Sequence, residues 1–184
     1  MIQPTVSAGL LRGLIDFAAT QGADPAALIA QAGVTAGRLD NPDNRLPFRA
    51  YVAAMAAAKA ATGNPALALH YAEQVGMSEV SVVGLIMEAS ATMGEAFLQL
   101  QRYGRLATEI VEPSEKPRFE LAFRDGLFMV YNRPDPNAFP ELTEEAFFRR
   151  VVGPRRCRAQ PHVLSVHVTH PAPSYRDEYD RSFQ

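Results

Sequence analysis

The sequence lacks most features that would indicate secretion, a membrane or a metal. Its 184 residues include one cysteine, Cys157, which can form neither an internal disulfide nor a cysteine-based zinc site. The longest apolar stretches, such as residues 50–61, fall far short of the roughly 20 strongly apolar residues of a membrane span, since this one is mostly alanine and contains Lys59. No basic leader with an apolar run and a cleavage site begins the chain. We therefore expect a cytoplasmic protein with no membrane partner.

An excess of charge and the known catalytic motifs are also missing. The 18 basic and 20 acidic residues give a net charge of -2, which provides no overall field for holding DNA. The sequence contains no Gly-rich phosphate loop, no G-x-S-x-G turn, no H-E-x-x-H pair and no dinucleotide fingerprint. These absences predict a protein that is not an enzyme, has no cofactor and does not bind DNA strongly by itself.

The histidines do not have the spacing of a metal site. Three of the four lie within residues 162–170, where alternating side chains predict a strand. His167 then points opposite to His162 and His170, which would be about 26 Å apart at roughly 3.3 Å per residue. One strand cannot bring these side chains together, so we predict no metal.

The first 77 residues predict a bundle of short helices. Residues 7–20 carry apolar side chains at three- and four-residue steps, and Gly22 ends that helix. Asp24 and Pro25 start a second helix as N-cap and first-turn residue. Pro47 opens a third helix that contains eight alanines, and residues 66–75 predict a fourth.

The remaining residues, 78–184, contain one long predicted helix. Residues 92–111 begin with a capping box, and apolar side chains then recur every three or four positions. Gln101 and Arg105 fall on the outer side of this helix. We expect its apolar stripe to face the core.

Alternating patterns follow the long helix. Residues 118–124 and 127–131 flank Asp125-Gly126, which is a strong hairpin signal. A helix over 141–150 and the strand over 162–170 complete the order. The sequence thus predicts an α+β fold, with an N-terminal helical bundle followed by a small mixed or antiparallel sheet packed against a long helix.

Basic residues gather near the end of the 141–150 helix. They are Arg149, Arg150, Arg155, Arg156 and Arg158. Such a cluster could bind an anionic ligand, a nucleic-acid backbone or an acidic partner. More often it is a solvated helix end that complements the helix dipole, and we interpret it in this way.

Three stretches of the chain carry a family resemblance. The first is GADP through AGV at 22–34 with LDNPDNRLP at 39–47; the second is GLIMEASATMGEA at 84–96, running on to Arg102-Tyr103. The third is PHV at 161–163 with HP at 170–171 and the closing segment 175–183. Together they resemble the N-terminal, arabinose-binding-type effector domain of AraC transcription regulators.

The resemblance implies a function in bacterial transcription regulation. Residues 1–184 would be one effector-sensing and dimerisation domain, with subregions 1–77 and 78–184, that binds a small-molecule effector and can form a homodimer. DNA would be bound only through a C-terminal helix-turn-helix domain, absent from this chain. The alternative is a protein–protein interaction or dimerisation module without a small ligand. A cavity with apolar walls and a few polar groups favours the sensor, whereas an exposed apolar patch favours the module.

Three residues are candidate ligand contacts. An effector pocket is expected between the long helix and the sheet, because both present an apolar face there. Tyr103 lies near the inner stripe of the helix and carries a hydroxyl on an apolar ring. Tyr131 and His167 lie on predicted strands and are weaker candidates.

Overall fold

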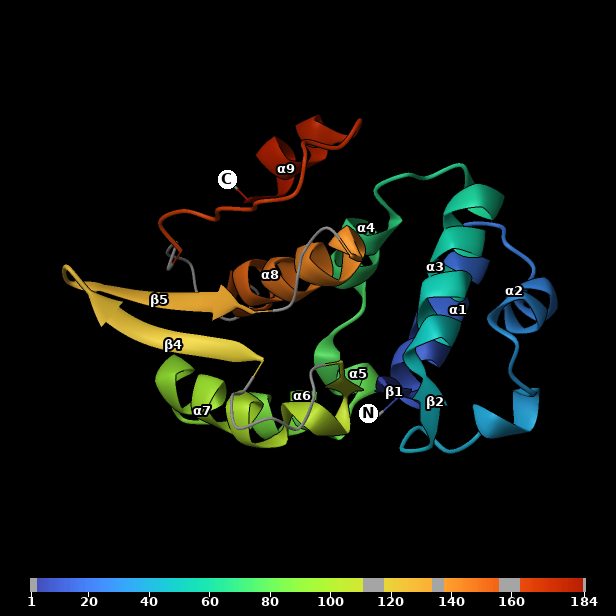
Figure 1. Ribbon diagram of the computed structural model, residues 1–184, viewed down its shortest axis with the longest axis horizontal. Coiled ribbons are helices and arrows are strands. Elements are labelled where there is room, and N and C mark those ends of the chain that lie inside the picture. Colours follow the sequence, from blue (N-terminus) through green and yellow to red (C-terminus); the bar gives the residue numbers. More distant parts are fainter. Residues whose placement is uncertain (1–2, 111–117, 134–137, 156–162, 184) are drawn as a thin grey trace.

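The computed structural model describes residues 3–110, 118–133, 138–155 and 163–183. Figure 1 shows helices α1, α2 and α3 at one end of the molecule and the hairpin β4–β5 at the other, with α4 and α8 between them. Within these residues the fold is α+β, with antiparallel sheets of three and two strands. The predicted fold class is confirmed.

The N-terminal helices form where local signals place them. They are α1 (Ala8–Thr20), α2 (Pro25–Ala32), α3 (Phe48–Thr62) and α4 (Leu67–Gln74). Asp24 Oδ1 accepts a hydrogen bond from the N–H of Ala26 at 3.0 Å, as its predicted N-cap role requires. The buried alanines of α3, Ala50, Ala54 and Ala58, recur every four residues on the side that contacts its neighbours. Their small side chains let the helices approach closely.

A short antiparallel sheet joins this bundle to the middle of the chain. Its strands are β1 (Thr5–Ser7), β2 (Arg45–Pro47) and β3 (Thr108–Glu109), in the order β2-β1-β3. Arg45 reinforces the junction, because its Nη2 donates to Thr5 Oγ1 at 2.6 Å. Strands of two or three residues are too short to show a period in sequence, so this sheet was not predicted.

Two short helices, α5 (Met77–Val80) and α6 (Val82–Glu88), cross at very close range. A Cβ at Gly84 would lie 2.1 Å from the carbonyl carbon of Met77. Only glycine therefore allows this crossing.

The long helix is shorter than predicted. Helix α7 spans Met93–Tyr103, and a 3₁₀ turn over Gly104–Leu106 follows it. Thr92 Oγ1 accepts from the Glu95 N–H at 3.1 Å, so the predicted N-cap is confirmed. The end was misplaced because residues 108–109 form β3, which pairs with β1, and this pairing depends on a segment about 100 residues away.

The predicted hairpin is confirmed. Strands β4 (Phe119–Arg124) and β5 (Leu127–Asn132) pair in antiparallel register. Asp125 and Gly126 have φ of 51° and 79°, the two positive values that a type I′ turn needs. The hairpin packs on α7 through the rings of Phe97 and Phe128, whose centroids are 5.7 Å apart.

The C-terminal part contains helices α8 (Pro140–Arg155) and α9 (Arg176–Phe183). The strand predicted over 162–170 is wrong: residues 163–169 form no strand, and His162 lies outside the described residues. Alternation shows only that a segment could line one face of a sheet. Strand formation also requires a neighbouring edge that supplies hydrogen bonds.

The core runs from the N-terminal helices to the first strand of the hairpin. It contains the fully buried rings of Tyr51 and Tyr71, and Phe119 at its far end. A smaller cluster around Phe148 joins α4, α8 and α9. Among the helices of the described part, none combines the length and apolar character that a membrane span needs.

A buried and an exposed leucine, both on helices, test which side chains pack in the core. Leu14 in α1 is fully buried, so Leu14→Ala should lower the free energy of unfolding by about 2–5 kcal/mol through lost contacts and a cavity. Leu98 in α7 is 60% exposed, so Leu98→Ala should change it by less than about 0.5 kcal/mol. Urea unfolding measures both. Similar losses at the two positions would contradict the packing.

Candidate functional site

A cavity of about 530 Å³ lies between α6, α7, α8 and the beginning of β4. Small-molecule sites in proteins commonly have about 300–1,000 Å³. The cavity borders both the long helix and the hairpin, where we expected a pocket. Helix α8 forms a further wall that the sequence did not indicate.

One side of the cavity is apolar. The side chains come mainly from α6 and α7 and include Met87, Met93, Ala96, Phe97 and Leu100. Gln101 also lines the cavity, and its Nε2 donates to the Phe119 carbonyl at 3.0 Å. The prediction that Gln101 lies on the outer side of the helix is therefore wrong. This contact fixes α7 to β4 beside the cavity.

A buried ion pair on α8 faces the cavity. Glu145 accepts from Arg149 Nε at 3.1 Å and from the Tyr51 hydroxyl at 2.6 Å. Burial, with Glu145 beside it, raises the pKa of the Tyr51 phenol well above its usual value, so Tyr51 remains a donor. Arg149 also donates to the Val75 carbonyl, and its guanidinium lies 4.7 Å from the centre of the Tyr71 ring. This arrangement fixes both members of the pair.

The pKa of Arg149 reflects two opposing effects. Burial favours the neutral form of the side chain and so lowers the pKa. The nearby carboxylate of Glu145 has the larger combined effect with the other neighbours, so the pKa of Arg149 is raised. Arg149 therefore stays charged in surroundings that exclude most water.

Two further arginines stand beside the pair. Arg118 donates to Thr108 Oγ1 at 2.9 Å and to Asn132 Oδ1 at 3.1 Å. Arg150 packs its guanidinium 4.0 Å from the centre of the Phe119 ring and donates to the Ala146 carbonyl. Both side chains line the cavity.

Burial lowers the pKa of both arginines. The pKa of Arg118 falls to about 10, although Glu145 opposes the change. The pKa of Arg150 falls to about 9, because the charges of Arg118 and Arg149 add to the effect of burial. Both remain protonated at neutral pH, so three guanidinium charges gather around one buried carboxylate. The interpretation of Arg149 and Arg150 as a solvated helix end is wrong; residues 156–158 of the basic run lie outside the described residues.

The neighbouring carboxylate of α8 serves another interface. Glu144 is buried and accepts from the hydroxyls of Tyr175, at 2.8 Å, and Tyr179. Burial and this carboxylate raise the pKa of both phenols, so both remain donors. Two successive residues of α8 thus have different partners: Glu145 bonds side chains beside the cavity, and Glu144 bonds tyrosines of the C-terminal segment.

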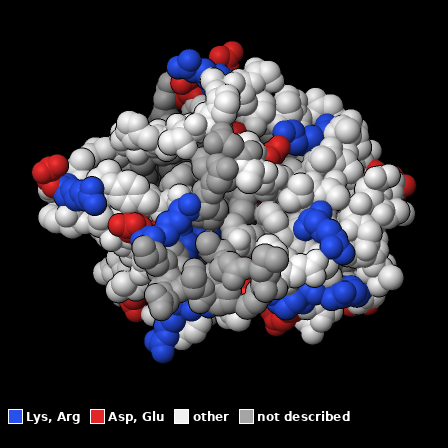
Figure 2. Space-filling model, viewed as in Figure 1, with Lys and Arg blue, Asp and Glu red and all other residues white. Residues whose placement is uncertain are grey.

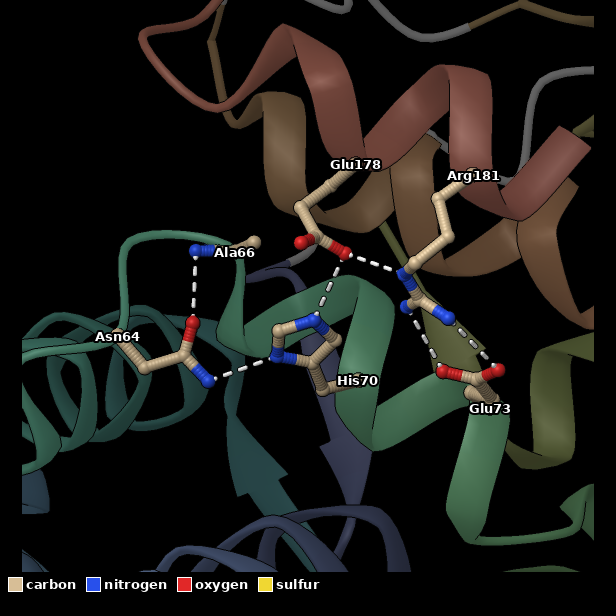
Figure 3. A network of polar contacts seen from close by, with 6 residues as sticks. All are labelled: Asn64, Ala66, His70, Glu73, Glu178 and Arg181. Atoms are coloured by element: carbon tan, nitrogen blue, oxygen red, sulfur yellow. Dashed lines mark hydrogen bonds and ion pairs between the residues drawn. The ribbon is translucent and has the colours of Figure 1, made fainter.

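Helix α9 is also attached to α4 by polar contacts (Figure 3). His70 Nε2 lies 3.1 Å from Glu178 Oε2, and Asn64 Nδ2 lies 2.8 Å from His70 Nδ1. Arg181 bonds both Glu178 and Glu73, reaching the two oxygens of Glu73 at 3.3 and 3.0 Å. Hydrogen bonds from Arg181 and His70 lower the pKa of Glu178. These partly exposed contacts add specificity to the docking of α9 and contribute little stability.

The surface has no comparable concentration of charge on the face in Figure 2, where basic and acidic side chains of the described residues form small separate groups. Among the described residues, no three His, Cys, Asp or Glu side chains form a group that could hold a metal ion.

Comparison with known proteins assigns the sequence to a family. The sequence model of the arabinose-binding domain of AraC transcription regulators, N-terminal, matches residues 22–184. The chain belongs to this family. No curated protein sequence matches the chain closely enough to count as a relative. Membership of this family supports a ligand-sensing regulatory domain.

The three candidate contacts of this AraC-type domain lie outside the cavity lining. Tyr103 is half-buried at the end of α7, with the Arg102 guanidinium 5.3 Å from its ring centre. Tyr131 is partly exposed on β5, and His167 is exposed, with Nε2 3.2 Å from Ser165 Oγ. The structure does not bring the three together. Their role in ligand binding stays a prediction.

Sequence reasoning missed the charged wall of the site. The alternating pattern of residues 118–124 did not indicate that Arg118 lines a cavity, and the predicted helix over 141–150 did not indicate that Glu145 is buried. One signal was available: residues 140–155 carry charged and apolar side chains on all sides of the helix. A helix of this kind that is covered on two sides must bury some of its charges.

Removing the charge of Glu145 tests the buried pair. Glu145→Gln keeps the shape but leaves Arg149 without its carboxylate, so the free energy of unfolding should fall by about 3–5 kcal/mol. Glu120→Gln is the matched control, because Glu120 pairs with Arg133 at a more exposed site and should contribute less than about 1 kcal/mol. Denaturant unfolding measures both. An unchanged midpoint for Glu145→Gln would show that the pair is not buried as described.

Proposed function

We propose that this chain senses a small-molecule effector in the cavity and passes the signal to an attached DNA-binding domain. The observation that carries the proposal is the combination of an apolar wall on α7 with fixed polar groups on α8 and at Arg118, just before β4. Family membership supports the same role. The chain would act through binding alone, without catalysis.

Helix α8 is the element that can transmit occupancy. Glu145 and Arg149 face the cavity, whereas Glu144 binds the tyrosines next to and within α9. A ligand that favours one position of α8 would also favour one position of α9. An effector acts in this way when it binds one of two arrangements more tightly. A helix-turn-helix domain following α9 would then receive the signal.

Filling the cavity tests the proposal. Ala96 is buried in the wall, so Ala96→Leu should block the space that an effector occupies. A thermal-shift screen that starts with amino acids, hydroxy acids and fatty acids should find a compound that stabilises the parent chain by about 2.7 kcal/mol at one hundred times its dissociation constant. The same compound should stabilise Ala96→Leu far less.

The control is Ala27→Leu, which adds the same atoms at an exposed position of α2 and should leave binding unchanged. Hydrogen exchange provides a second readout, because binding should alter protection in α9 as well as in α8. Equal stabilisation of the Ala96→Leu and parent chains would refute the cavity as the site. The screen also tests the earlier candidates: weaker binding by Tyr103→Phe, Tyr131→Phe or His167→Ala would place the effector outside the cavity.

A second candidate function, self-association, is favoured by the hairpin. Phe123 is 75% exposed, and Leu127 and Phe128 beside it are also exposed. Exposed apolar side chains at strand edges commonly mark interfaces. A second copy of this chain is the partner that fits, because an antiparallel edge can pair with itself around a two-fold axis.

Sedimentation equilibrium tests this association. Phe123→Ser should weaken self-association at least about tenfold if the hairpin forms the interface, because the loss of one buried aromatic contact exceeds about 1.4 kcal/mol. Leu164→Ser, at another exposed apolar position, should have no effect. A parent chain that stays monomeric at high concentration would exclude the interface.

A further inference from the structure

Within the described part of the chain, one nitrogen of Arg149 in the cavity wall has no hydrogen-bond partner. Arg149 uses Nε for Glu145 and Nη1 for the Val75 carbonyl, but its Nη2 is buried without a hydrogen-bond partner. The side chain is only 10% exposed and lines the cavity. An unsatisfied donor on a buried cation is unfavourable, because burial removes the water that would otherwise accept from it. A ligand with an acceptor oxygen would relieve this cost.

The charges around the cavity point to an anion. Among the described residues that line it, the guanidinium groups of Arg118, Arg149 and Arg150 surround the buried carboxylate of Glu145, so a negatively charged ligand would offset part of this excess of positive charge. Arg118 strengthens this conclusion, because its hydrogen bonds within the described residues go to neutral oxygens of Thr108, Asn132 and Leu142. The two other acidic lining residues lie on different elements: Glu88 accepts from Ser78, and Glu109 is near Arg45.

The apolar wall of the cavity indicates the chemistry of the uncharged part of the ligand. Phe97, Leu100 and Ala96 on α7 and Met87 on α6 offer only apolar surface to the cavity. A molecule that is polar throughout would lose hydration there without gaining hydrogen bonds. A ligand with a charged end and an apolar body fits both walls.

We propose that the effector is an amphipathic monocarboxylate, whose carboxylate accepts from Arg149 Nη2 beside Arg118 and Arg150 and whose apolar body packs against α7. This inference rests on the proposed sensing function and specifies its ligand class. A carboxylate oxygen can accept a charge-assisted hydrogen bond from Nη2, the guanidinium nitrogen that Glu145 and Val75 leave unused.

The experiment compares acids with neutral molecules of the same body. The probes are octanoate with 1-octanol, decanoate with 1-decanol, and 1-naphthoate with 1-naphthamide; octyl phosphate tests the other common anion. Each competes with N-phenyl-1-naphthylamine, an uncharged dye that becomes fluorescent in apolar cavities. Ala96→Leu should reduce dye binding and so confirm where the dye lies.

At least one acid should displace the dye at a concentration at least about tenfold lower than its neutral counterpart, because charge-assisted hydrogen bonds in a buried site contribute that much. Arg149→Lys should remove most of this advantage, since lysine keeps the charge but has one nitrogen, which cannot bond Glu145, Val75 and the ligand from the three fixed positions of a guanidinium. Arg12→Lys is the control, because Arg12 is exposed on α1, and it should leave the advantage unchanged. If Arg149→Lys fails to fold, the comparison of acid with neutral molecule in the parent chain still decides the proposal.

The other outcomes separate this inference from the sensing function. Equal displacement by acids and neutral molecules would overturn the anionic class while leaving a sensor of neutral ligands. A preference of about tenfold or more for octyl phosphate would replace the monocarboxylate with a phosphate ligand. If neither the dye nor any probe binds, the inference fails and the cavity is not an effector site.

Discussion

The rest of the structure depends on the burial of charges along α8. This helix lies between the cavity and the C-terminal segment, and it carries ionised side chains toward both. Glu145 and Arg149 are one turn apart and compensate each other on the cavity side, while Glu144 is satisfied by two phenols. Buried charges are tolerated only with well-placed partners, because desolvation is expensive. Tyr51, Tyr71, Tyr175 and Tyr179 are therefore fixed in position by the charges of one helix.

This constraint also explains why the cavity is suited to binding. Three arginines held near one another repel, and the repulsion is strengthened where water is excluded. A protein could avoid it with apolar residues of similar size, which often stabilise a fold more than buried ions do. A bound carboxylate would offset this repulsion. Occupancy would then change the electrostatic balance on α8, and Glu144 on the same helix is where α9 is attached.

Much of the fold is predictable from local signals. Asp24 caps α2, Pro47 precedes α3, and Asp125-Gly126 adopts the two positive φ angles of a tight hairpin turn. These features depend on backbone chemistry within a few residues, so sequence is sufficient. Prediction failed at residues 104–110 and 163–169. In both segments the conformation depends on whether a distant strand is available to pair, which no local pattern reveals.

In the candidate site, too, some features are predictable from the sequence and others only from the tertiary structure. The sequence by itself determined that Glu145 and Arg149 lie four residues apart on a helix and that an apolar stripe runs along α7. It also determined the family, through motifs spread over most of the chain. Only the tertiary structure decided that these charges are buried, that Arg118 joins them from another element, and that Gln101 faces inward. The reason is physical: whether a charge is solvated depends on what packs over it, and here the covering side chains come from α3, α4, α7 and β4.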